Sequence, residues 1–524
     1  MTRSQISRRH VLWMGGGAAL LAALPGYGQS IPQPVFSDYP FQLGIASGEP
    51  SADGFVIWTR LAPQPLEQGH GMPAAVVPVQ WQVAEDESFR TVVQTGEALA
   101  RPELGHSVHV EVAGLQPGRP YFYRFTAGRE RSMMGRARTL PAPGADVQSV
   151  RFAVGGCQHY EQGLYTAWRH AAAEDVDFVF CYGDYIYEGR SQRMRTVSGW
   201  PVVSVRQHPG QEVYSLEDYR QRYAIYKMDP DLQGAHAAAA WFPVWDDHEI
   251  DNNWVSDLDQ DGTPPEVFRL RKRAAMQAFY ENMPLRSTSF PNGPSMSLYR
   301  RASFGNLLDM NFLDTRQYRT DQPCNDRWRV ECADLSNPKA DVLGAAQEAW
   351  LMEGLTSSRA RWKAMAQQVM MMDLDREPGE TYAANLDSWG GYRAPRERLL
   401  RGLTDQRIKD TVILTGDEHQ NYAGNVHLDG QNPGKIPITS EFVATSISSG
   451  GDGADMRPDM PEVVAVNPEL RFNNAQRGYL VCQVTPDLWK THFRVIDQIS
   501  TPGGSVSTRA TYALEHGKPG LVEA

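Results

Sequence analysis

Short runs of alternating apolar and polar residues occupy the first part of the chain, from Phe41 to about Leu140. Gly, Pro and Asp residues separate these runs. Alternation with a period of two predicts strands, and short strands at this spacing predict a β-sandwich. The expected strands are residues 54–60, 77–83, 106–112 and 120–126. We therefore expect a small β-sandwich domain over residues 38–145.

The pattern changes after residue 150, where apolar runs become continuous and alternate with helical stretches. Runs at 151–155 and 176–182 flank a predicted helix at 163–173, which is the order of a βαβ unit. Further core strands are expected at 411–415 and 442–446. Residues 344–357 and 359–372 indicate an amphipathic helix that passes into a buried segment. This order predicts a layered α/β domain over residues 150–510, joined to the sandwich by a linker at 141–144.

The first thirty residues have a separate character. Residues 7–12 read Ser-Arg-Arg-His-Val-Leu, and the apolar run at 11–24 is rich in Gly and Ala. A membrane anchor is the alternative, but the run is too short for a bilayer core of about 30 Å, and Pro and Gly residues end it. We expect a twin-arginine signal peptide over residues 1–30, recognition by the twin-arginine export machinery, and a periplasmic or secreted mature protein without a membrane span.

Net charge and cysteine content bear on the binding partners of the protein and on its compartment. The 524-residue chain has a net charge of -11 and contains no basic block, so nucleic-acid binding is not expected. It contains five cysteines. Cys324 and Cys332 bracket a polar segment and form a plausible disulfide in an oxidising compartment. Cys181 and Cys482 lie inside apolar runs, which favours buried strand cysteines.

Potential metal ligands gather where four of the predicted strands end. The clusters are Gly-Gly-Cys-Gln-His at 155–159, Gly-Asp-Tyr-Ile-Tyr-Glu at 183–188, Asp-Asp-His-Glu-Ile-Asp-Asn-Asn-Trp at 246–254 and Gly-Asp-Glu-His-Gln-Asn at 416–421. Any one of them could be a helix cap or a hydrogen-bonded core residue. Four together at strand ends indicate a functional site. Asp417 and His419 would share a side if their segment were extended.

These motifs resemble the PhoD-type alkaline phosphatases, which are relatives of the purple acid phosphatases and of the calcineurin-like metallophosphoesterases. The likeness covers nearly the whole mature chain. It includes a fibronectin type III-like stretch from Gly114, Trp-Asp-Asp-His-Glu at 245–249, Asp-Thr-Arg-Gln-Tyr-Arg at 314–319 and Gln-Gln-Val-Met-Met at 367–371. The resemblance implies a metallophosphoesterase-like layered α/β domain preceded by a fibronectin type III-like β-sandwich.

The resemblance also implies two unlike metal sites. It places a ferric ion on Cys157, Asp184, Tyr187 and His419. It makes Asp184 a bridge to a second site, which is completed by Asp247 and Asp417 and filled by calcium. Oxygen ligands suit calcium. Asp247 stands where the wider group has Asn, and Asp417 stands where that group has His, so both departures favour a hard cation. Asn253 is a further candidate for contact with calcium or with the phosphate, and Asn252 is an equally good one.

The implied reaction is hydrolysis of phosphate monoesters by a metal-activated water or hydroxide. His248 would assist the leaving group, or alternatively would orient a metal ligand. A phosphodiesterase or phospholipase D-like activity on the same metal core is the alternative among enzymes. The alternative outside enzymes is an exported binding protein with a degenerate site, against which the intact ligand types at all four strand ends argue.

Overall fold

The computed structural model describes residues 34–197, 200–326, 332–379, 381–430, 433–434 and 436–524. The signal peptide predicted for residues 1–30 lies outside these ranges. Within the described ranges, no helix combines the length and the apolar character needed to cross a membrane.

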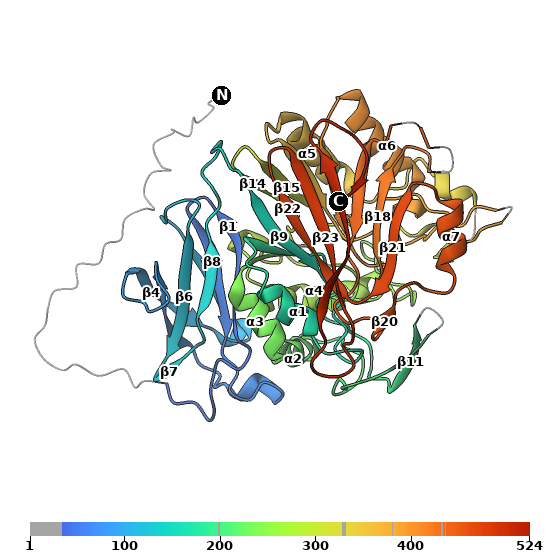
Figure 1. The fold of residues 1–524 in the computed structure, drawn as a ribbon. Helices are drawn as coiled ribbons and strands as arrows, with labels where there is room; N and C mark the ends of the chain where they lie inside the picture. Colours follow the sequence, from blue (N-terminus) through green and yellow to red (C-terminus); the bar gives the residue numbers. More distant parts are fainter. Residues whose placement is uncertain (1–33, 198–199, 327–331, 380, 431–432, 435) are drawn as a thin grey trace, which may run out of the picture.

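Two large β-sheets form the body of the chain (Figure 1). The first sheet contains, in spatial order, β25 (Val522–Glu523), β24 (Val506–Glu515), β23 (Leu488–Ile496), β22 (Gly478–Val484), β9 (Val150–Gly155), β10 (Phe178–Cys181), β13 (Ala240–Pro243), β1 (Ile45–Ser51), β2 (Gly54–Arg60) and β5 (Ser107–Val112). The second contains β14 (Arg300–Phe304), β15 (Leu308–Phe312), β16 (Trp362–Ala366), β17 (Thr411–Thr415), β19 (Thr439–Val443), β18 (Asn421–Val426), β21 (Leu470–Gln476) and β20 (Gly453–Ala454). Strands β9, β10 and β13 are parallel neighbours, as are β15, β16, β17 and β19.

Aromatic side chains join the two sheets face to face. The ring centroids of Phe178 and Phe304 lie 4.8 Å apart, and those of Phe242 and Phe312 lie 4.4 Å apart. Along β10, Phe178 and Phe180 face the second sheet, whereas Val179 and Cys181 face the helices. Strands buried on both faces read as continuous apolar runs, which explains the change of pattern after residue 150.

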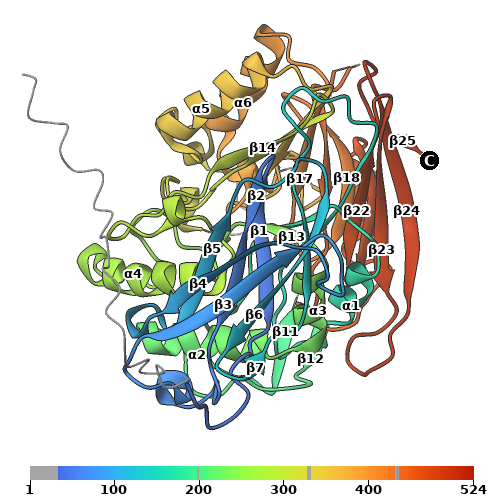
Figure 2. The same cartoon turned by 90° about the vertical axis from the view of Figure 1, so that its left-hand side faces the viewer.

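Helices cover the outer faces of both sheets. Side chains of α1 (Thr166–Ala172), α2 (Leu216–Lys227), α3 (Pro230–Ala238) and α4 (Pro265–Asn282) pack against the first sheet. Side chains of α5 (Gly344–Ser357), α6 (Arg393–Asp405) and α7 (Met460–Val466) pack against the second. Figure 2 shows α5 and α6 at the top and α1, α2 and α3 below. The predicted layered α/β architecture is therefore confirmed.

The N-terminal β-sandwich is present, but it is not a separate unit. Its outer sheet consists of β4 (Val92–Ala100), β3 (Val77–Ala84), β6 (Pro120–Ala127), β7 (Glu130–Arg131) and β8 (Gly135–Arg138). Its inner sheet is β1, β2 and β5, and β1 pairs in parallel with β13 of the α/β layer at Ser47 and Ala240. The ten-stranded sheet thus runs through both parts of the chain, and the segment after β8 connects parts that already share a sheet.

One local expectation needs correction: the strand expected at 442–446 lies at Thr439–Val443. The helix expected at 344–357 is α5, and the buried segment expected at 359–372 is buried along most of its length and contains strand β16. A remaining hairpin, β11 (Met194–Val197) with β12 (Trp200–Val203), projects at the lower right of Figure 1.

Candidate metal centre

The four clusters at strand ends converge on one place between the two sheets. Cys157 follows β9, Asp184 follows β10, Asp247 follows β13, and Asp417 follows β17 of the other sheet. The first three strands are parallel neighbours, so their carboxyl ends share one edge. The candidate ligands therefore come from the same end of both sheets.

The backbone at this place is left-handed at several non-glycine residues. Positive φ angles occur at Cys157 (50°), Asp184 (52°), Asn253 (52°), Asp417 (65°) and His419 (53°). Such angles cost free energy and concentrate at functional sites. The segment that carries Asp417 and His419 is consequently not extended, and the two side chains join different groups.

The first group consists of Cys157, Asp184 and His419, whose ligand atoms all lie within 4.8 Å of one another. The Tyr187 hydroxyl donates to Asp184 Oδ2 at 2.7 Å and lies 3.2 Å from His419 Nε2. Burial and the charge of Arg477 hold the pKa of His419 well below its usual range. The imidazole is therefore neutral, which is the form that binds a metal.

The second group consists of Asp246, Asp247 and Asp417, and Asp184 lies within the same distance of Asp247 and His248. Asp184 therefore borders both groups. Burial, followed by the nearby carboxylates, raises the pKa of Asp417 well above its usual range, and burial also raises that of Asp184. So many buried carboxylates repel one another and are costly without compensating cations.

Buried oxygen atoms without a hydrogen-bond partner indicate whether these residues could hold cations. Among the described residues, Asp184 Oδ1, Asp246 Oδ2 and Asp247 Oδ1 are buried oxygens without a hydrogen-bond partner. A buried acceptor in this state is destabilising. A thiol, a phenol, an imidazole and a carboxylate on one side suit a transition metal, and carboxylates on the other suit a hard cation. The residues present thus fit two unlike ions.

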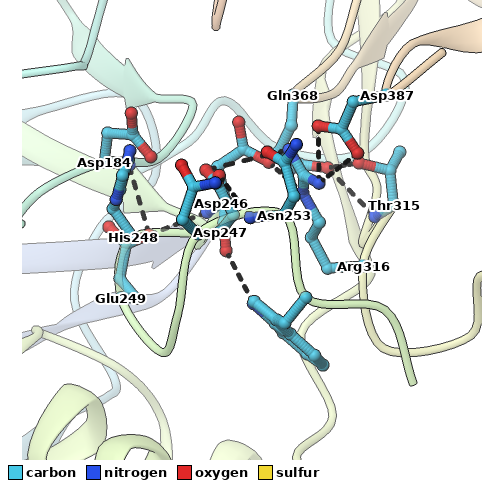
Figure 3. Close-up of polar contacts among 12 residues, drawn as sticks. Asp184, Asp246, Asp247, His248, Glu249, Asn253, Thr315, Arg316, Gln368 and Asp387 are labelled. Atoms are coloured by element: carbon cyan, nitrogen blue, oxygen red, sulfur yellow. Dashed lines mark hydrogen bonds and ion pairs between the residues drawn. The ribbon is translucent and has the colours of Figure 1, made fainter. Parts of the chain in front are cut away.

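Arg316 supplies an internal positive charge to the second group (Figure 3). Its Nε donates to Asp246 Oδ1 at 2.6 Å, and its NH1 donates to Asp387 Oδ1 at 2.8 Å. The guanidinium is fully buried, and its NH2 lies 3.7 Å from Asp247 Oδ1. Sequence reasoning assigned no role to Arg316, Asp387 or Asp246. The position of Arg316 just after strand β15 is the signal that could have found it.

His248 lies beside Asp184 and is paired with an acid. Its Nδ1 lies 2.7 Å from Glu188 Oε2, and its ring is 4.1 Å from that of Tyr187. Burial alone would lower the pKa of His248, but the charges of Glu188 and Asp247 raise it well above its usual value. Because Nδ1 faces Glu188, Nε2 is the nitrogen left for another partner.

The structure distinguishes the two neighbouring asparagines. The backbone N–H of Asn253 donates to Asp247 Oδ2 at 2.9 Å, so this residue lies beside the second group. The side chain of Asn252 instead donates to Gln260 Oε1. Cys324 and Cys332 are joined as a disulfide, and their Cα atoms are 6.3 Å apart.

Glu249 ties two of the ligand loops together. Its carboxylate accepts hydrogen bonds from the backbone N–H groups of Asp184 at 3.2 Å, Tyr185 at 2.5 Å and Asp246 at 2.8 Å. The loops after β10 and β13 are therefore held in one arrangement by a single buried side chain.

The chain is similar to a known family along most of its length. The sequence profile of the PhoD-like phosphatase family matches residues 152–493, and the profile of the N-terminal domain of PhoD-like phosphatases matches residues 28–141. The chain belongs to the PhoD-like phosphatase family. This confirms the family resemblance and the expectation of a phosphoric ester hydrolase.

Individual relatives agree with the family. Alkaline phosphatase D of Bacillus subtilis (strain 168) is 46% identical over 488 residues, which cover 93% of this chain and 83% of the relative. The solved structure of PhoD matches with a TM-score of 0.91 and 46% identity, covering 94% of this chain and 93% of that one. A purple acid phosphatase from yellow lupin shares the fold at 12% identity, with a TM-score of 0.54 over 90% of this chain and 74% of that one.

Proposed function

We propose that this PhoD-like phosphatase is an exported enzyme that hydrolyses phosphate monoesters, with a ferric ion and a calcium ion at its centre. Cys157, Asp184, Tyr187 and His419 would hold the ferric ion. Asp184, Asp247 and Asp417 would hold calcium, with Asn253 beside them. The observation that carries the proposal is the pair of ligand groups of unlike chemistry that meet at Asp184.

Bound cations at such a centre polarise phosphoryl oxygens and lower the pKa of water so that it can attack phosphorus. The protein contributes the positions of the reacting groups. Asp184, bordering both groups, fixes their separation, and Glu249 fixes the backbone that carries Asp184 and Asp246.

His248 is the residue suited to the leaving group. Its raised pKa keeps the imidazole protonated at neutral pH, and its Nε2 is directed away from Glu188. A proton held at Nε2 can pass to the departing alkoxide oxygen, which would otherwise leave as an anion. Glu188 retains the positive charge of the ring until that transfer.

Export rests on two features. The twin-arginine pattern of residues 7–12 precedes the domains, and the disulfide between Cys324 and Cys332 suits an oxidising compartment. Cell fractionation tests this: replacing both Arg8 and Arg9 by Lys should retain the protein in the cytoplasm. Unchanged export of that variant would contradict the assignment.

The function is tested by hydrolysis of p-nitrophenyl phosphate and of bis(p-nitrophenyl) phosphate by the purified protein, with and without a chelator. We expect chelator-sensitive turnover, faster on the monoester, and iron and calcium in the purified protein. Faster turnover of the diester would replace the monoester assignment with a phosphodiesterase. Binding of phosphate esters without hydrolysis would leave only a binding protein.

A further inference from the structure

The side-chain amide of Asn253 is held by an acid outside the candidate ligand groups. Its side-chain Nδ2 donates to Asp326 Oδ2 at 2.7 Å, while its backbone N–H donates to Asp247. An ionised carboxylate only accepts hydrogen bonds, so the amide nitrogen must face Asp326. The amide oxygen of Asn253 therefore faces away from Asp326, and Asp326 decides which atom the asparagine can offer to a cation.

A second contact to Asn253 comes from the same loop. Gln322 Nε2 donates to the backbone oxygen of Asn253 at 2.8 Å and to Asp387 Oδ1 at 2.8 Å. Gln322 and Asp326 lie on either side of Cys324. The disulfide-forming cysteine thus stands at the centre of a short segment that contacts Asn253 twice.

The backbone of this segment needs support. Cys324, Asn325 and Asp326 have φ angles of 59°, 56° and 53°, three successive left-handed positions. Each such position in a non-glycine residue costs free energy and persists only where the surroundings impose it. The bond from Cys324 to Cys332 and the apolar contacts of both cysteines with Leu335 and Leu386 provide that support.

We propose that Asp326 is a positioning residue for Asn253, and that the Cys324–Cys332 disulfide keeps Asp326 in place, so that calcium binds with full affinity only when the disulfide is closed. The inference rests on the proposed calcium site. A dithiol would reverse the effect: two electrons and two protons convert the disulfide to two thiols, and the dithiol becomes a disulfide. An enzyme in a reducing compartment would bind calcium weakly and gain it after export.

Calcium binding measured by isothermal titration calorimetry tests the role of Asp326. Partners of metal-site residues typically contribute about 10–100-fold in metal affinity, and we expect a loss in this range for Asp326→Ala. Asp326→Asn keeps an oxygen acceptor and should stay within a few-fold of wild type. Asp86→Ala is the control, because Asp86 holds a remote turn by accepting from Ser88, Arg90 and Thr91.

Two further arms separate positioning from general damage. In an Asn253→Ala background, Asp326→Ala should cause no additional loss, because the residue through which Asp326 acts is gone. Dithiothreitol, or the double variant Cys324→Ser/Cys332→Ser, should weaken calcium binding to wild type but not further in Asp326→Ala. Iron content and the melting temperature, measured in parallel, should stay close to wild type in Asp326→Ala.

The outcomes are distinct. Wild-type calcium affinity in Asp326→Ala, or an equal loss in the Asn253→Ala background, would overturn this inference alone. If dithiothreitol leaves the calcium affinity of the wild-type protein unchanged, although thiol titration shows that the disulfide is reduced, the role of the disulfide is overturned. A wild-type protein that binds no calcium and cleaves neither ester would overturn the proposed function as well.

Discussion

The two sides of the metal centre are built from different chemistry and stabilised in different ways. On the Cys157 side the ligands are a thiol, a phenol and an imidazole, and the nearby Arg477 donates to uncharged groups, Ser446 Oγ and the backbone oxygen of Ser449. On the Asp247 side the candidate ligands are carboxylates, and Arg316 forms ion pairs with Asp246 and Asp247.

This difference would let one centre select the two proposed cations. Arg316 compensates Asp246 and Asp387 at 2.6 and 2.8 Å and Asp247 at 3.7 Å, so a hard cation that prefers oxygen would complete the compensation of Asp247 and Asp417. No carboxylate other than the shared Asp184 belongs to the first described group. Its softer donors favour a transition metal.

The largest effect is expected from replacing Asp184, the residue that borders both groups. Asp184→Ala removes the carboxylate that borders both groups, so both ions should be lost. Activity on p-nitrophenyl phosphate should fall by about a thousandfold or more, beyond the 10–100-fold typical of residues that merely support a ligand. Elemental analysis of the variant should show neither metal at stoichiometric level, and retention of either one at full occupancy would contradict the bridging role.

Replacing one ligand on each side should separate the two ions. Cys157→Ser should lose iron and keep calcium, whereas Asp417→Asn should lose calcium and keep iron. Each should lower the turnover rate by about a hundredfold, because a two-metal clamp needs both partners. Elemental analysis of the pair is the check, and parallel loss of both metals in both variants would argue against independent sides.

Removing the buried positive charge of Arg316 should destabilise the fold on the carboxylate side of the centre. In Arg316→Met, Asp387 keeps its ion pair with Arg319. Asp246 is left buried without its ion-pair partner, and breaking such a pair costs about 3–5 kcal/mol. Urea unfolding with and without calcium measures this. We expect added calcium to restore more stability in Arg316→Met than in wild type, and an equal calcium effect in both would be the contrary result.

The smallest expected effect concerns the proton at His248, between the two sides. The charge of Glu188 raises the pKa of His248, so protonated His248 persists to higher pH than a free histidine would. Glu188→Gln should lower that pKa and move the alkaline limb of the rate profile to lower pH. A profile of kcat against pH decides the matter, and an unmoved alkaline limb would exclude His248 as the donor.

The strand-end clusters could be predicted because each is local: an apolar run is followed within a few residues by ligand types, as with Asp184 after β10. The pairing of Arg316 with Asp387 could not, because 71 residues separate them and only the fold brings them together. The joining of β1 to β13 was missed for the same reason, since pairing between distant strands leaves no mark on either local pattern.

The local backbone conformation could not be predicted from the sequence either. The alternation rule would place Asp417 and His419 on one side only if their segment were extended, and both residues adopt positive φ. Their surroundings impose this conformation, and a residue's own preference does not reveal it. The separation of the two side chains into different ligand groups follows from that local departure.

The most direct test of two unlike sides is a crystal structure with anomalous diffraction recorded on both sides of the iron absorption edge. We expect one iron peak, beside Cys157 and His419, and a density without iron signal beside Asp247 and Asp417. Iron peaks of equal height at both positions, or an iron peak only beside Asp247, would contradict it.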